Sequence, residues 1–135
     1  MSLKTTTFSS ANELVTVFSQ RIADILKQAI SEKGKASLVV SGGSTPVPLF
    51  KALSVRAIDW SKVTITLADE RWVASTDAAS NERLVRQNLL QDKAAAANFI
   101  PLKTGHNNAE DAVEQLTATF MKVGLPFDAV ILGMG

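Results

Sequence analysis

The sequence predicts an α/β fold, with a mainly parallel sheet in a three-layer α/β/α arrangement, and three observations support that prediction. Short apolar runs that suit buried strands alternate with longer segments whose apolar residues recur at helical spacing. The run at 128–132 is nearly all apolar, as expected when helices cover both faces of a sheet. A pair of glycines joins the first strand to the helical pattern that follows it.

The first helix and the first strand have clear sequence signals. Residues 10–33 are expected to form one long amphipathic helix, because Ser10–Glu13 has the form of a capping box and Gly34 supplies a stop. A strand is expected at 37–41, immediately before the paired glycines.

A second helix and a second strand follow. The helix is expected over about 45–57, with Thr45 as its cap and Pro46 in the first helical position, where a missing N–H costs nothing. Residues 62–68 alternate apolar and polar side chains before turning apolar, which predicts a strand.

The second half of the chain repeats the alternation. The expected elements are a helix capped by Ser80 or Asn81, a short extended piece at 99–102, a helix over about 109–123 between Asn108 and Gly124, and a strand at 128–132.

The composition fits one globular domain and excludes several kinds of site. The 135 residues suffice for a single domain, and the formal net charge of +1 with scattered Lys and Arg argues against nucleic acid as a partner. The absence of cysteine and the single histidine exclude thiolate zinc and multi-histidine metal sites, and no feature calls for a metal or an organic cofactor. No apolar run approaches the roughly 20 residues of a membrane span, and residues 1–7 do not form a secretory signal, so a cytoplasmic protein without membrane contact is expected.

The turn at 41–46 is the most informative motif. Its glycines let an anion approach the backbone, and the N–H groups and dipole of the following helix favour negative charge. The spacing matches neither the P-loop nor G-x-G-x-x-G. We interpret residues 42–45 as a phosphate cradle, and an ordinary strand-to-helix turn is the alternative that this motif alone leaves open.

A second motif, Asp69-Glu70-Arg71, ends the second strand. In an extended backbone Asp69 and Arg71 share one face while Glu70 takes the other. The planar fork of Arg71 suits phosphate, and an acid beside it would orient sugar hydroxyls or handle a proton; a surface turn with a local ion pair is the alternative. Ligands of parallel sheets bind beyond the carboxyl ends of the strands, so residues 42–45, 69–73 and 133–135 are expected on one rim.

Together these motifs resemble the glucosamine-6-phosphate isomerase/6-phosphogluconolactonase family. The match in order and spacing comprises Ser41–Pro46, Asp69–Val73, Ser80-Asn81 with Leu89-Leu90, and Leu132–Gly135, over about residues 35–135. The resemblance implies hydrolysis of 6-phospho-glucono-1,5-lactone to 6-phosphogluconate, in the oxidative pentose phosphate pathway. It also implies the Rossmann-type sheet that glucosamine-6-phosphate isomerase/deaminase shares with ribose-5-phosphate isomerase.

The resemblance also implies roles for individual residues, with a small sugar phosphate as the partner. Asp69 and Glu70 would shape the pocket, and Asn81 would hold the loop that closes over it or simply cap a helix. The substrate-binding residues implied are Gly42, Gly43, Ser44, Thr45, Asp69, Glu70, Arg71, Asn81, Gly133 and Gly135.

The sequence departs from the family after Gly135, where members continue into Asp-Gly-His-x-Ala-Ser with the His as proposed general base. We therefore expect residues 1–135 to be one truncated α/β domain that is poorly active or inactive by itself. Asp69 is the remaining candidate base, and a carboxylate is a weaker base than imidazole. His106 lies in a polar loop ahead of a helix and is expected to be solvated, with substrate contact from the rim as the alternative.

The strand at 128–132 carries a further expectation. Left as a sheet edge, its apolar residues would invite self-association.

Three readings compete with the lactonase. One is an isomerase or deaminase acting on an amino sugar phosphate, another is a non-catalytic sugar-phosphate-binding module, and the third is a fragment without an intact site. Arg71 and Trp72, following the acidic pair, favour the lactonase.

Overall fold

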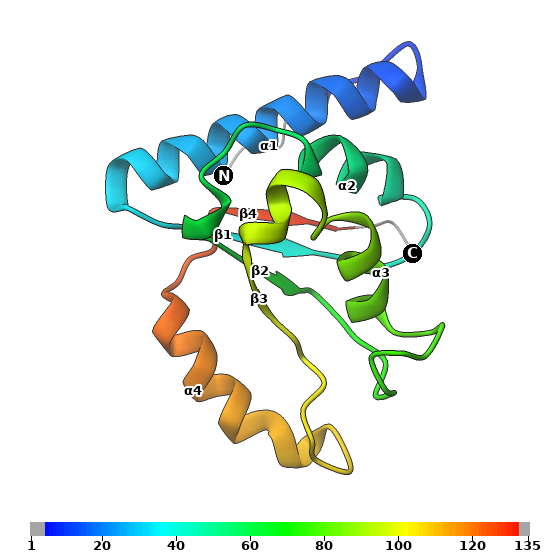
Figure 1. Ribbon diagram of the computed structural model, residues 1–135, viewed down its shortest axis with the longest axis vertical. Coiled ribbons are helices and arrows are strands. Elements are labelled where there is room, and N and C mark those ends of the chain that lie inside the picture. Colours follow the sequence, from blue (N-terminus) through cyan, green and yellow to red (C-terminus); the bar gives the residue numbers. More distant parts are fainter. Residues whose placement is uncertain (1–4, 133–135) are drawn as a thin grey trace.

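The computed structural model describes residues 5–132 and contains one four-stranded sheet with helices packed against it (Figure 1). In chain order the elements are α1 (Ala11–Lys33), β1 (Ala36–Val40), α2 (Val47–Ser54), η1 (Trp60–Lys62), β2 (Val63–Leu67), α3 (Asn81–Asn88), η2 (Asp92–Ala96), β3 (Asn98–Ile100), η3 (Glu110–Ala112), α4 (Val113–Val123) and β4 (Ala129–Ile131).

The sheet is parallel throughout, in the order β3-β2-β1-β4. In the register, Val40 of β1 lies beside Leu67 of β2 and Ile131 of β4. Helices α1 and α2 lie along one side of the strands in Figure 1, and α4 lies on the other. The predicted α/β class with a parallel sheet is therefore confirmed.

Ser10 caps α1 and Gly34 ends it as the sequence indicated, but only half of the expected capping box forms among residues 5–132, because the Glu13 carboxylate accepts from the Ser9 hydroxyl. The hydroxyl of Ser10 accepts a hydrogen bond from the backbone N–H of Glu13 at 3.1 Å. Gly34 adopts a left-handed conformation with φ 79°, and its N–H donates to the carbonyl of Ile30 at 2.8 Å. A side chain at position 34 would strain this backbone, so glycine ends the helix here.

Helix α2 is shorter than predicted, and two expectations about its start are wrong. Pro46 occupies the cap position instead of the first helical position, and Thr45 makes no capping hydrogen bond. A cap at Thr45 would bond the N–H of Val47 or of residue 48; Pro48 has none, and the N–H of Val47 donates to the carbonyl of Ser44 at 3.3 Å. The helix also ends at Ser54, because the chain turns so that Arg56 donates to Gln20 and Ser19 on α1.

The remaining elements match the expectations to within a few residues. Ser80 caps α3 by accepting from the N–H of Arg83 at 3.2 Å, which decides between the two expected caps. Asn108 accepts from the N–H of Asp111 at 3.1 Å and so holds the 3₁₀ turn η3, while α4 itself begins only at Val113. Gly124 ends α4 as predicted.

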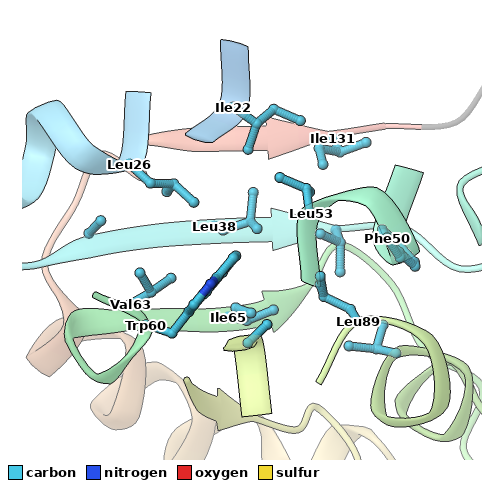
Figure 2. Packing of buried hydrophobic residues seen from close by; sticks show 14 of the residues in the cluster. Ile22, Leu26, Leu38, Phe50, Leu53, Trp60, Val63, Ile65, Leu89 and Ile131 are labelled. Atoms are coloured by element: carbon cyan, nitrogen blue, oxygen red, sulfur yellow. The ribbon is translucent and has the colours of Figure 1, made fainter. Parts of the chain in front are cut away.

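One face of the sheet carries the hydrophobic core (Figure 2). Side chains from β1 and β2 meet α1, α2, α3 and η1 there, and the Trp60 indole N–H donates to the carbonyl of Arg56 at 3.1 Å. The largest fully buried side chains are Trp60, Phe50, Leu26, Leu38, Leu53, Ile65 and Leu89. Burying each such side chain stabilises the fold by roughly 1.5–3 kcal/mol, so this core stabilises the strands whose ends carry the site.

The opposite face is covered less completely. Val39 and Thr66 are buried, but Val130, which lies beside Val39 on β4, is 50% exposed. The apolar sequence of β4 predicts that both faces of this strand are covered, but at Val130 one face is not. β4 lies at the edge of the described sheet, as expected.

Candidate functional site

The first two predicted rim segments do lie together at the carboxyl end of the sheet. β1 and β2 are neighbours, and the N–H of Ala68 donates to the carbonyl of Val40 at 2.8 Å just beyond the strands. The chain then continues to Gly42 from one strand and to Asp69 from the other. The third segment follows β4, where the Ser41 hydroxyl donates to the carbonyl of Ile131 at 3.1 Å. Gly133 and Gly135, which were predicted to complete the rim, lie outside the described residues.

The backbone of residues 42–45 presents free donors. Within residues 5–132, none of these four N–H groups donates a hydrogen bond to another group of the protein. Gly43, Ser44 and Thr45 are exposed, so water or a ligand has to satisfy the N–H groups. Four successive free donors ahead of a helix N-terminus are an arrangement that suits an anion.

The two glycines of this turn are required for different reasons. Gly43 has φ 96°, a left-handed backbone that side chains rarely adopt, and a Cβ there would meet open space. Gly42 lies instead against Asn81, and a Cβ at position 42 would stand 2.0 Å from the Oδ1 of Asn81. The sequence alone gave no sign of this contact, because the two residues belong to different elements.

The carboxylate of Glu70 is fully engaged with the start of α3. Its Oε1 accepts from the N–H of Asn81 at 2.7 Å and from the N–H of Arg71 at 2.8 Å. Its Oε2 accepts from the N–H of Glu82 at 2.9 Å and from the hydroxyl of Ser80 at 3.4 Å. Glu70 therefore acts as a carboxylate anchor for the helix N-terminus, where negative charge is stabilising.

Unlike the side chain of Glu70, those of Asp69 and Arg71 are not engaged. Both residues are exposed, and within the described part of the chain neither side chain makes an ion pair or donates or accepts a hydrogen bond. The local ion pair that was the alternative explanation of this motif is thus not formed among residues 5–132. A guanidinium and a carboxylate remain available at the rim.

Trp72 joins the rim to a loop that sequence reasoning did not connect with it. Its indole N–H donates to the backbone carbonyl of His106 at 3.1 Å, and the ammonium of Lys103 lies 4.8 Å from the ring centroid. The Nδ1 of His106 lies 2.6 Å from the hydroxyl of Thr104, and the residue is only partly exposed. His106 is a partly exposed loop residue that is tied to Trp72 through its backbone carbonyl and not through its ring, and its loop is part of the rim.

The amino end of the sheet holds a separate polar cluster. Asp128 pairs with Lys33 and accepts from the N–H of Ser37 at 2.8 Å. Burial alone would raise the pKa of Asp128, but hydrogen bonds from Lys33 and Ser37 together with the charge of Lys33 outweigh it and hold that pKa below its usual value.

Other sites are few in the part of the chain that the structure describes. One open depression lies beside Asp128 and α1, another along α3, and neither includes residues 42–45. No group of three acidic or histidine side chains in residues 5–132 converges in a way that would hold a metal ion. None of the described helices combines the length and apolar character that crossing a membrane takes.

Comparison with known proteins gives a family match over nearly the whole chain. The family model described as glucosamine-6-phosphate isomerases/6-phosphogluconolactonase matches residues 9–135. The chain is 45% identical over 128 residues to the 6-phosphogluconolactonase of Rhizobium meliloti (strain 1021), a match that covers 95% of this chain and 55% of that protein. It is 43% identical to the 6-phosphogluconolactonase of Pseudomonas aeruginosa, with 95% of this chain and 54% of that protein covered.

Solved structures agree with the sequence relatives. A 6-phosphogluconolactonase from Shewanella baltica OS155 is similar with a TM-score of 0.92 and 49% identity, covering 95% of this chain and 55% of that one. A monomeric glucosamine-6-phosphate deaminase has a TM-score of 0.70 at 17% identity, covering 85% of this chain and 48% of that one, a likeness of fold alone. The chain spans about half the length of the curated relatives it matches.

Proposed function

Since the chain belongs to the family of glucosamine-6-phosphate isomerases and 6-phosphogluconolactonases, we propose that its strand-end rim binds a sugar phosphate. We further propose that this binding serves the hydrolysis of 6-phospho-glucono-1,5-lactone to 6-phosphogluconate. The observation that carries the proposal is that, among residues 5–132, the N–H groups at 42–45 and the guanidinium of Arg71 have no partner and lie on the same edge of the sheet.

The chemistry of the phosphate fits these groups. Backbone N–H donors and an Arg fork both hydrogen-bond to phosphate oxygens, and the dipole of α2 adds positive potential at its N-terminus. Gly42, Gly43, Ser44 and Thr45 would hold the phosphate in this proposal, with Arg71 as the charged partner. Gly133 and Gly135 remain proposed rim residues.

Hydrolysis of the lactone needs a base as well as a binding site. Water attacks the lactone carbonyl, the ring C–O bond breaks, and the products are a carboxylate and a hydroxyl. In this proposal Asp69, exposed at the rim, orients the sugar hydroxyls and is the weak base that this chain supplies. Losing a well-placed general base costs on the order of 100- to 10,000-fold in rate. We propose the cytoplasm as the place of this reaction.

Titration of 6-phosphogluconate by calorimetry tests the proposed binding. Arg71→Ala is expected to weaken binding about 10- to 100-fold, since a hydrogen bond to a charged group contributes roughly 1.5–3 kcal/mol. Arg21→Ala is the matched control, because Arg21 is an exposed arginine of α1. Equal affinity for both variants and the unmodified protein would remove Arg71 from the site, and absence of binding by the unmodified protein would refute the proposal.

An amino sugar phosphate is the second candidate substrate, because the description of the matching family covers both activities. There Asp69 would move a proton between carbon atoms instead of activating water. A panel of the lactone and glucosamine-6-phosphate, assayed side by side, separates the two, and turnover of the amino sugar alone would favour the deaminase.

A further inference from the structure

Two loops of the rim are joined through the N-terminus of α3. Glu70, directly after Asp69, binds the N–H groups of Asn81 and Glu82 with its carboxylate at 2.7 and 2.9 Å. These are the first two residues of the helix, whose N–H groups have no partner within it. The loop after β2 therefore fixes the position and direction of α3.

Asn81 extends this connection to the loop after β1. Its side-chain Nδ2 donates to the backbone carbonyl of Asp69 at 3.1 Å. Its amide head also fills the space beside Gly42, where a Cβ would stand 2.0 Å from Oδ1, 2.3 Å from Cγ and 2.8 Å from Nδ2. One side chain thus bonds the Asp69 backbone and touches the start of the free N–H segment.

We infer that Glu70 and Asn81 are positioning residues, which hold residues 42–45 and Asp69 in register with each other across the rim. The missing side chain at position 42 then makes room for Asn81, while the backbone N–H of Gly42 stays available to the anion. The part of this inference that concerns ligand affinity rests on the proposed function.

The inference makes Gly42→Ala and Asn81→Ala equivalent changes. A methyl group at position 42 pushes out the Asn81 amide, which loses its hydrogen bond to Asp69, and Asn81→Ala removes the same amide directly. The three atoms nearest the added methyl all belong to that amide, and Asn81→Ala removes all three. Residues that act through one contact show non-additive effects.

A double-mutant cycle of Gly42→Ala and Asn81→Ala tests the inference, with two readouts on the purified protein. Thermal unfolding is followed by circular dichroism, and 6-phosphogluconate is titrated at a temperature where every variant is folded. Each single variant is expected to lower the melting temperature and to weaken binding about tenfold, and the double variant is expected to match Asn81→Ala in both. Gly105→Ala is the control for the melting temperature, because Gly105 has open space around it and no positive φ.

Glu70→Gln provides the second arm. Both oxygens of Glu70 accept hydrogen bonds, so the NH₂ group of a glutamine would face a backbone N–H, donor against donor. Ligand binding should therefore weaken. Glu114→Gln is the control, because Glu114 is an exposed acid on α4, and it should leave binding unchanged. Additive losses in the cycle would overturn the inference, as would unchanged affinity in folded Glu70→Gln and Asn81→Ala. Absence of ligand binding by the unmodified protein would refute the proposed function instead, and the melting cycle would still decide whether Asn81 and Gly42 act together.

Discussion

The indole N–H of Trp72 donates to the backbone carbonyl of His106, 34 residues further along the chain, at a distance of 3.1 Å. This bond, together with the Lys103 ammonium over the same ring, fastens the loop after β3 to the segment after β2. The side of the rim next to Arg71 is therefore built from two loops that are distant in sequence.

Replacing Trp72 tests how much these two contacts contribute to the stability of the protein. Trp72→Phe keeps an aromatic face for Lys103 but removes the donor, and we expect it to lower the free energy of unfolding by about 1 kcal/mol. Trp72→Ala should cost more, because it also removes the ring from Lys103. Urea denaturation measures both, and faster amide exchange at residues 104–107 should accompany the loss; unchanged exchange in Trp72→Ala would contradict the fastening.

Gly43→Ala is expected to destabilise the protein through the backbone alone. Its φ of 96° is unfavourable for alanine, although the methyl group would meet no atom within 4 Å. The cost should be about 1–3 kcal/mol, read from the free energy of unfolding. Gly105→Ala should change it by less than about 0.5 kcal/mol, because that position has no positive φ and has free space around it. A similar cost at both glycines would show that the φ of Gly43 is not the cause.

The ion-paired Asp128 should make stability depend on pH in the acid range. Its pKa in the folded protein is lower than in the unfolded chain, so its contribution is fully present above the unfolded value of about 3.9 and is lost as pH falls through the lowered folded pKa. Asp128→Asn should cost about 1–2 kcal/mol at pH 7 and should flatten the acid limb of the stability curve. Unfolding by urea between pH 3 and 7 measures this, and curves that stay parallel would contradict it.

Self-association through β4 remains a prediction that the exposed side chains of that strand support. Val130, on the strand at the edge of the described sheet, is 50% exposed, and Leu132, directly after that strand, is 68% exposed. Val130→Lys should lower the apparent mass in light scattering, because a charge on an edge strand disfavours pairing with another chain. Val55→Lys changes a valine of similar exposure, 54%, at the end of α2 and should have no such effect. A monomeric unmodified protein would refute the prediction.

The sequence predicted the elements and the shared rim because these depend on local patterns. Ser10, Gly34 and Ser80 carry their signals within a few residues, and parallel strands necessarily bring residues 42–45 and 69–73 to one edge. The cap at Thr45 failed for a local reason as well, since Pro48 has no N–H and the N–H of Val47 donates to the carbonyl of Ser44.

What the sequence did not reveal depends on contacts between distant elements. Nothing near Gly42 indicates that Asn81 fills the space beside it, and nothing near Glu70 indicates that its carboxylate anchors α3. Nothing near His106 indicates that its backbone carbonyl accepts from Trp72, which lies at another strand end. Such contacts follow from packing, which composition and periodicity do not encode.

The cluster of Asp128, Lys33 and Ser37 lies at the amino end of the sheet, whereas the rim lies at the carboxyl end. A strand of five residues such as β1 separates the two ends by about 15 Å, beyond the Debye length at physiological salt. A substitution at Asp128 should therefore change the stability of the protein without changing its affinity for the ligand. A change in affinity would show that the two ends of the sheet are coupled through β1.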